Sequence, residues 1–140
     1  MPQPARSPVI QGAGRTLLES ERFDRIGQFG RKLLITLASL HTALLGSTSA
    51  SWPEIAGKMR HWKWLTATDE QRINILCWYG KLIANTDMHL GNPSFHIRNT
   101  DTSQPPLELA PAYDMLPMHY APLSSGEVPA DANLSPPPFT

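Results

Sequence analysis

Residues 82–98 read LIANTDMHLGNPSFHIR, and this stretch decides how the chain around it is organised. It begins at the end of an apolar helical pattern, passes through Asp87, His89 and Asn92, and ends in the strand-like segment SFHIR. No other segment of the sequence is so crowded with side chains capable of chemistry. The pattern therefore predicts a functional loop between a helix and a strand, with Asp87, His89 and Asn92 as its candidate residues.

A strand, a turn and a helix are predicted upstream of the loop. TLLESERF (residues 16–23) has the branched and aromatic content of a short strand, and DRIGQFGR (residues 24–31) is typical of a turn with two glycines. Leucines recur at helical spacing over residues 33–45. Gly46 stands where a helix C-cap glycine belongs, so the helix is predicted to end there.

Two further helices are indicated by capping boxes, in which a Ser or Thr precedes a Glu or Gln by three residues. The first box is Ser51 and Glu54, with a proline in the first turn, and it begins a helix of about residues 51–62. The second box is Thr68 and Gln71, which begins a helix that leads directly into the loop. The apolar stripe predicted for this third helix consists of Ile75, Leu76, Tyr79, Leu82 and Ile83.

The segments that follow the loop favour a β-hairpin. SFHIR (residues 94–98) and LELA (residues 107–110) are short strand candidates, and a polar, proline-containing segment separates them. With three helices before it, this hairpin predicts an α+β fold that is mainly α-helical.

Proline divides the chain into a middle and two ends. Nine of the 14 prolines lie from Pro105 onward and three precede residue 10, so regular structure is expected mostly between them. We expect residues 1–15 to be disordered, residues 16–122 to form the folded core, and residues 123–140 to form a proline-rich tail.

Composition excludes several classes of function. Twelve basic and twelve acidic residues cancel, so no basic footprint predicts direct binding to nucleic acid. The single cysteine, Cys77, excludes an intramolecular disulfide, fits a reducing compartment, and is expected to be a buried structural thiol. No window is apolar enough to span a membrane, and the first residues lack the apolar region of a secretion signal. A soluble, cytoplasmic protein without membrane partners is expected.

The loop has the residue types that phosphoryl transfer requires. That chemistry needs a carboxylate to accept or orient the proton of an attacking hydroxyl, and a neutral oxygen ligand to hold Mg²⁺ on the phosphates. Asp87 and Asn92 have the Asp-x4-Asn spacing of a kinase catalytic loop. A second metal-binding Asp must come from a later segment, and Asp114, after the predicted hairpin, is the candidate.

Other interpretations of these residues remain open from the pattern alone. Asp87 could be a turn residue that bonds its own backbone, Asn92 a loop initiator before proline, and Asp114 a cap of the following turn. A metal-dependent hydrolase that uses Asp87, His89, Asp114 and His119 is a further alternative, although these residues show no preferred ligand spacing.

Three motifs together resemble one family. NTDMHLGNPSF (residues 85–95) and LAPAYDMLPM (residues 109–118), with ESERFDR (residues 19–25) upstream, resemble the HipA-like serine/threonine kinases, which are the toxins of type II toxin–antitoxin modules. Within that family the sequence is most similar to the YjjJ-like branch. The motifs occur in the family's order, and the resemblance covers about residues 17–122. It implies part of a protein-kinase-like C-terminal lobe.

The resemblance implies a role for each matching residue. Asp87 matches the catalytic Asp, and His89 matches a loop His that braces the catalytic loop. Asn92 and Asp114 match the two ligands of Mg²⁺, and both thereby bind the ATP cofactor.

It also implies where the nucleotide base is held. Glu21 and Phe23 match the hinge, where backbone groups meet the adenine ring. Gly91 departs from the family pattern, because Lys is often found before the loop Asn.

The resemblance further implies protein partners, and it implies that the small lobe of the kinase is missing. The expected activity is transfer of a phosphoryl group from Mg-ATP to a Ser or Thr of a protein such as an aminoacyl-tRNA synthetase, and an antitoxin is an expected partner. Gly12 and Gly14 do not make a phosphate-covering glycine loop, and Lys32 is the first lysine, so the small lobe is expected to be absent and the chain to be a fragment. The alternative is a catalytically inactive kinase remnant that acts as a binding module.

Overall fold

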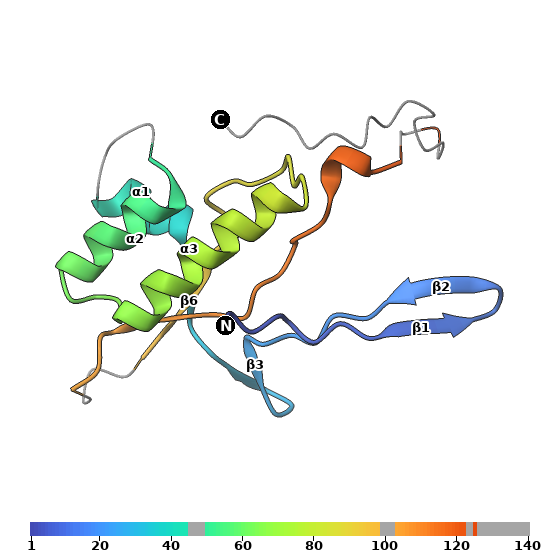
Figure 1. The fold of residues 1–140 in the computed structure, drawn as a ribbon. Helices are drawn as coiled ribbons and strands as arrows, with labels where there is room; N and C mark the ends of the chain where they lie inside the picture. The colour runs from blue at the N-terminus through green and yellow to red at the C-terminus, as the bar shows by residue number, and fades with distance from the viewer. Residues whose placement is uncertain (45–49, 99–102, 123–124, 126–140) are drawn as a thin grey trace.

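The structure, a computed structural model, describes residues 1–44, 50–98, 103–122 and Ser125 (Figure 1). Within this part, three α-helices combine with three small antiparallel sheets, which confirms the α+β class. The helices are α1 (Leu37–Leu44), α2 (Trp52–His61), α3 (Ala67–Leu82) and a short 3₁₀ helix, η1 (Met118–Tyr120). The strands are β1 (Val9–Gly12), β2 (Arg15–Leu18), β3 (Arg25–Ile26), β4 (Gly30–Arg31), β5 (Leu34–Thr36), β6 (Ser94–Ile97) and β7 (Leu107–Leu109).

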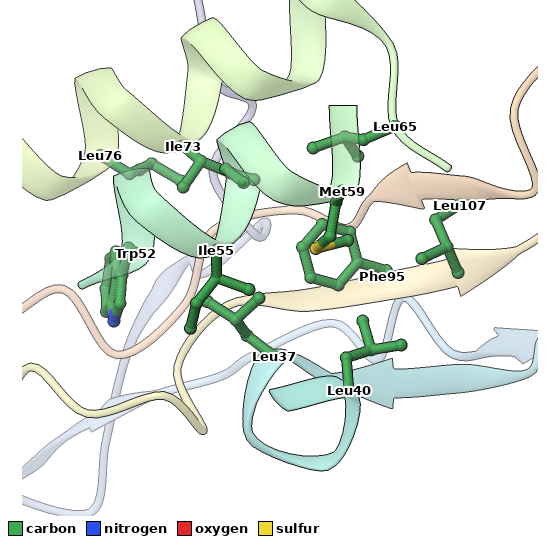
Figure 2. Close-up of a cluster of buried hydrophobic side chains, with 11 residues drawn as sticks. Leu37, Leu40, Trp52, Ile55, Met59, Leu65, Ile73, Leu76, Phe95 and Leu107 are labelled. Carbon is green, nitrogen blue, oxygen red and sulfur yellow. The ribbon is translucent and has the colours of Figure 1, made fainter. Parts of the chain in front are cut away.

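The hydrophobic core lies between the helices and the three-stranded sheet β5-β6-β7. Phe95 of the central strand β6 is fully buried and pairs with Ile35 on one side and Leu109 on the other. Figure 2 shows Phe95 beside Met59 of α2 and Leu107 of β7. Because β6 follows the candidate loop directly, this packing fixes the loop's outgoing end. The other large side chains that are fully buried are Leu37, Ile55, Met59, Leu65 and Ile73.

Three predicted features are confirmed. Helix α2 begins with the predicted capping box, in which the Ser51 N–H donates to Glu54 Oε2 at 2.7 Å and the Glu54 N–H donates to Ser51 Oγ at 3.4 Å. Strands β6 and β7 form the predicted hairpin, with His96 opposite Glu108. The segment DRIGQFGR is also a turn, as predicted, and it carries the β3–β4 pair with Gly27 at a φ of 58°.

The prediction of a leucine helix over residues 33–45 is wrong at its start. Residues Leu34–Thr36 form β5 and pair with β6, so α1 begins only at Leu37. Thr36 ends the strand and caps the helix, because its Oγ1 accepts the N–H of Ser39 at 3.1 Å. The β-branched pair Ile35 and Thr36 suits a strand. The predicted helix end at Leu45 and Gly46 lies outside the described residues.

The predicted start and face of the third helix are also wrong. The N-cap is Thr66, whose Oγ1 accepts the Asp69 N–H at 3.0 Å, and Thr68 lies within the first turn. The buried face carries Asp69, Ile73, Leu76 and Gly80. Of the predicted stripe only Leu76 is buried, whereas Ile75, Tyr79 and Leu82 are exposed and Ile83 is half-buried. The helix is apolar on more than one side, so its periodicity did not identify the packed face.

An N-terminal hairpin differs from the expectation for residues 1–15. Strand β1 lies in this segment and pairs along its length with β2. The strand predicted over residues 16–23 is therefore right only for its first part, because β2 ends at Leu18 and residues 19–23 are not in a strand. Ala13 and Gly14 both have positive φ, 50° and 73°, which is the conformation of a tight two-residue hairpin turn. The hairpin projects away from the helices and its side chains are exposed (Figure 1). The domain boundaries stay predictions, and the tail lies outside the described residues except for Ser125.

Two expectations drawn from composition can be compared with the structure. In the described part of the chain, none of the helices combines the length and apolar character that a membrane crossing requires. Cys77 is half-buried rather than buried, and this burial raises the pKa of its thiol above the ordinary value.

Candidate active site

The candidate loop leaves α3 through a sharp change of backbone direction. Ala84, which is buried, has a φ of 54°, and the Asn85 N–H donates to the Gly80 carbonyl at 2.9 Å. The Ala84 carbonyl accepts the N–H of His119 at 3.0 Å. The loop's incoming end is therefore bound both to its own helix and to the segment that follows Asp114.

Asn85 connects the two acidic candidates. Its Oδ1 accepts the Asp87 N–H at 3.0 Å, and its Nδ2 donates to the Asp114 carbonyl oxygen at 3.4 Å. The residue is buried, so these bonds have little competition from water. We did not predict Asn85 as a site residue. Its place between the end of the helix and Asp87 was the available signal.

The fold brings Asn92 and Asp114 together. Asn92 is buried, and its Nδ2 lies 3.4 Å from Asp114 Oδ2. Its Oδ1 accepts the N–H of His89 at 2.8 Å. Asp114 is exposed and has a φ of 57°, an uncommon conformation for a residue other than glycine but one that Asp tolerates better than most. Backbone strain of this kind is concentrated at functional positions.

Asp87 and His89 lie on the exposed side of the loop. No hydrogen bond within the described residues holds the Asp87 carboxylate, so it can turn toward a substrate group. The Nδ1 of His89 accepts the Gly91 N–H at 3.0 Å, which makes His89 a brace of the turn before Asn92. The bracing role that the family resemblance implies for His89 stays a prediction.

Tyr113 joins the Asp114 segment to the loop. Its hydroxyl donates to the Gly91 carbonyl at 2.9 Å and lies 2.6 Å from Ser94 Oγ. The Phe23 ring packs against Tyr113, with 5.7 Å between ring centroids, and against His96 at 5.9 Å. Ser94 is a further contributor that sequence reasoning missed, because a serine in a strand gives no signal of its partner.

The two predicted hinge residues differ in their placement. Phe23 reaches the site through Tyr113, whereas the Glu21 carboxylate lies 3.8 Å from the Arg6 guanidinium, and both side chains are exposed. The Glu21 N–H donates to the Arg6 carbonyl at 2.9 Å. The structure therefore connects Phe23, but not the Glu21 side chain, to the Asn92–Asp114 pair.

A groove of about 570 Å³ adjoins Asp114. Asp114 and Ser20 are polar residues on its wall, and Ser20 directly precedes Glu21. Most of the wall is apolar, and it includes Leu18, Ile75, Tyr79, Met115 and Leu116. Its size is in the range of sites for small molecules, about 300–1,000 Å³.

The hydrolase alternative lacks a geometric basis. In residues 1–44, 50–98, 103–122 and 125, no three His, Cys, Asp or Glu side chains are placed to hold a metal ion together. Asp87, His89, Asp114 and His119 thus do not form the cluster which a transition-metal hydrolase requires. The oxygen pair of Asn92 and Asp114 is a different kind of site, suited to a hard cation that keeps several water ligands.

The chain as a whole has counterparts among known proteins. Residues 3–134 match the model of the HipA-like C-terminal domain. This match covers nearly the whole chain, so the chain belongs to the family of HipA-like C-terminal domains. The match also confirms the resemblance that the three motifs indicate. Among individual proteins, Toxin YjjJ of Escherichia coli (strain K12) is 38% identical over 134 residues, an alignment that covers 91% of this chain. The chain spans 29% of the length of that relative.

Proposed function

We propose that this chain carries the catalytic loop and metal ligands of a serine/threonine protein kinase that uses Mg-ATP. The observation that carries the proposal is the contact between Asn92 and Asp114, with Asp87 five residues before Asn92 on the same loop. This is the set of groups that phosphoryl transfer requires: one carboxylate for the hydroxyl proton and two oxygen ligands for the metal. Membership of the family of HipA-like C-terminal domains supports it.

The donor set fits Mg²⁺, with one rearrangement. The ligands would be the Asp114 carboxylate and Oδ1 of Asn92, both of the oxygen type that Mg²⁺ prefers. Asn92 now turns its Nδ2 toward Asp114 and its Oδ1 toward the His89 N–H. Metal binding by Oδ1 therefore requires the Asn92 amide to turn over and to release the His89 N–H.

The groove beside Asp114 is the proposed place of the nucleotide. Its apolar wall would suit a purine base, and Asp114 on the same wall would hold the phosphate end through Mg²⁺. Ser20 on this wall directly precedes Glu21 in the chain, which supports the hinge role proposed for Glu21 and Phe23. When bound, Mg-ATP supplies the phosphoryl group and the positive charge that offsets its oxygens.

Asp87 is the proposed base. Its exposed carboxylate accepts the proton of a Ser or Thr hydroxyl while that oxygen bonds to the γ-phosphorus and the bond to the leaving ADP oxygen breaks. His89 holds the turn between Asp87 and Asn92 through its bond from Gly91 and is proposed to assist in this way.

The protein substrate and the antitoxin belong to the proposal as well. The sequence similarity is to a protein named as a toxin, and we propose a cytoplasmic toxin kinase whose target is a protein such as an aminoacyl-tRNA synthetase. No direct role for nucleic acid binding or membranes is proposed.

A thermal-shift experiment with two matched variants tests the proposal. Mg-ATP at about one hundred times its Kd is expected to stabilise the unmodified chain by about 2.7 kcal/mol. Asp114→Asn should lose most of the shift, whereas Asp87→Asn should keep it but fail to transfer the γ-phosphate to protein. The absence of any shift in the unmodified chain would refute nucleotide binding. A shift without phosphoryl transfer in the unmodified chain would instead identify an inactive binding module.

A further inference from the structure

A second cavity, of about 270 Å³, is lined by residues of β6, β7 and α3, and neither Asn92 nor Asp114 lines it. Its polar lining comes from separate segments: Gln3 near the N-terminus, Lys32 before β5, Arg72 of α3, and the cross-strand neighbours His96 and Glu108. The backbone of residues 109–111 completes the wall. The cavity is therefore built by folding and not by one flexible loop.

The balance of charge in this cavity is positive. The Arg72 guanidinium bonds Asp69 Oδ1 at 2.9 Å, and Asp69 is almost completely buried. The carboxylate of Glu108 is similarly taken up by Arg98, at 3.2 Å. Lys32 remains without an ion-pair partner among the described residues. Its charge also acts on His96, whose pKa is lowered by burial and by Lys32.

Two buried nitrogen atoms of the lining residues have no hydrogen-bond partner within the described part of the chain. These atoms are Nε of Arg72 and Nδ1 of His96. Buried polar groups are normally paired, so each such exception calls for an explanation. Both atoms are closed to water, so an anion in the cavity would meet Arg72 through its other guanidinium N–H groups, for which an oxygen with negative charge is the strongest acceptor.

We propose that this cavity binds an oxyanion of the phosphate class. Lys32 supplies the uncompensated charge, Arg72 supplies N–H donors held in place by Asp69, and the Gln3 amide adds a neutral donor from the opposite segment. Glu108 opposes an anion, but its bond to Arg98 takes up that charge. Binding here needs neither a divalent cation nor the Asn92–Asp114 pair, so the proposal is independent of the kinase function.

An NMR titration of the whole chain with sodium phosphate, at constant ionic strength, tests the proposal. Saturable shifts are expected at the amides of Gln3, Lys32 and His96. Lys32→Gln should weaken phosphate binding about fivefold, as expected for the loss of a charge-assisted bond from an exposed lysine. Lys58→Gln removes the same charge from the exposed face of α2, away from the cavity, and should leave the affinity unchanged.

Further arms separate this site from the kinase site and identify the source of the phosphate. Asp114→Asn should keep phosphate binding, whatever its effect on Mg-ATP. Tighter binding of O-phosphoserine than of inorganic phosphate would support a phosphorylated protein as the source, and equal binding would support free phosphate. The proposal is overturned by non-saturable shifts, by equal losses in Lys32→Gln and Lys58→Gln, or by shifts confined to the surroundings of Asp114.

Discussion

The Nδ2 atom of Asn92 lies 3.4 Å from Oδ2 of Asp114, although the two residues are 22 positions apart. The β6–β7 hairpin makes this possible, because it returns the chain to the loop from which it started. Around the contact, the hydroxyl of Tyr113 and the amide of Asn85 bond both segments. The pair is therefore positioned by the fold before any ligand binds.

Tyr113→Phe should loosen this arrangement. The substitution removes the hydroxyl that bonds Gly91 and Ser94, and a buried group left without its partner costs about 1–3 kcal/mol. The free energy of unfolding from urea titration should fall by that amount. Tyr79→Phe is the matched control, because Tyr79 is exposed and should tolerate the change. Equal small effects of the two substitutions would contradict the role given to Tyr113.

Asn85→Ala should disturb both acidic residues at once. It removes the acceptor of the Asp87 N–H and the donor to the Asp114 carbonyl, in a buried position. We expect a loss of about 1–3 kcal/mol in stability together with faster hydrogen exchange at the Asp87 amide. Unchanged exchange at Asp87, measured by NMR, would show that Asn85 does not hold the loop.

The start of α3 can be tested with two threonines. Thr66→Ala should cost about 1 kcal/mol, because Thr66 is the N-cap that accepts the Asp69 N–H. Thr68→Ala should have little effect, since Thr68 is exposed within the first turn. Thermal unfolding of both variants measures the difference. A larger loss of stability in Thr68→Ala than in Thr66→Ala would instead support the capping box of Thr68 and Gln71 that the sequence predicted.

Stability should decrease in mild acid because of His96. Burial, with a further contribution from Lys32, lowers the pKa of His96 in the folded protein, while Glu108, the Leu33 backbone and Asp24 oppose this shift. The unfolded chain then binds a proton more readily than the folded chain, so the free energy of unfolding decreases as the pH falls through about 6.5, the ordinary pKa of His. Above that pH the contribution of His96 is fully present.

The measurement is the Tm of the chain and of His96→Gln between about pH 7.5 and pH 5.5, in a buffer free of phosphate. The loss of Tm on acidification should be smaller in His96→Gln. An identical loss in both proteins would assign the pH dependence to other groups.

Local signals predicted the fold where one interaction dominates. The Ser51–Glu54 capping box and the β6–β7 hairpin depend on neighbouring residues, and both could be predicted. Leu34 and Ile35 became a strand because β6, about 60 residues further on, pairs with them, and a leucine pattern does not record that partner. The start of α3 was misplaced because two threonines lie close together and only one has the extended backbone of a cap.

In the candidate site, too, some residues could be predicted from local sequence and others could not. The spacing of Asp87 and Asn92 was evident, and the position of Asp114 followed from the hairpin. Asn85 and Ser94 could not be predicted, because each acts through a tertiary contact made by an ordinary polar residue. The cavity around Lys32 and Arg72 could not be predicted either, since its residues come from separate segments.

Paramagnetic broadening by Mn-ATP tests the central claim most directly. Mn²⁺ takes the oxygen ligands that suit Mg²⁺ and broadens the NMR signals of nearby amides. At low Mn-ATP, the amide signals of Asn92 and Asp114 should broaden first in the unmodified chain, and Asp114→Asn should remove the effect. Broadening that is absent, or that is centred elsewhere and persists in Asp114→Asn, would contradict a metal–nucleotide site at this pair.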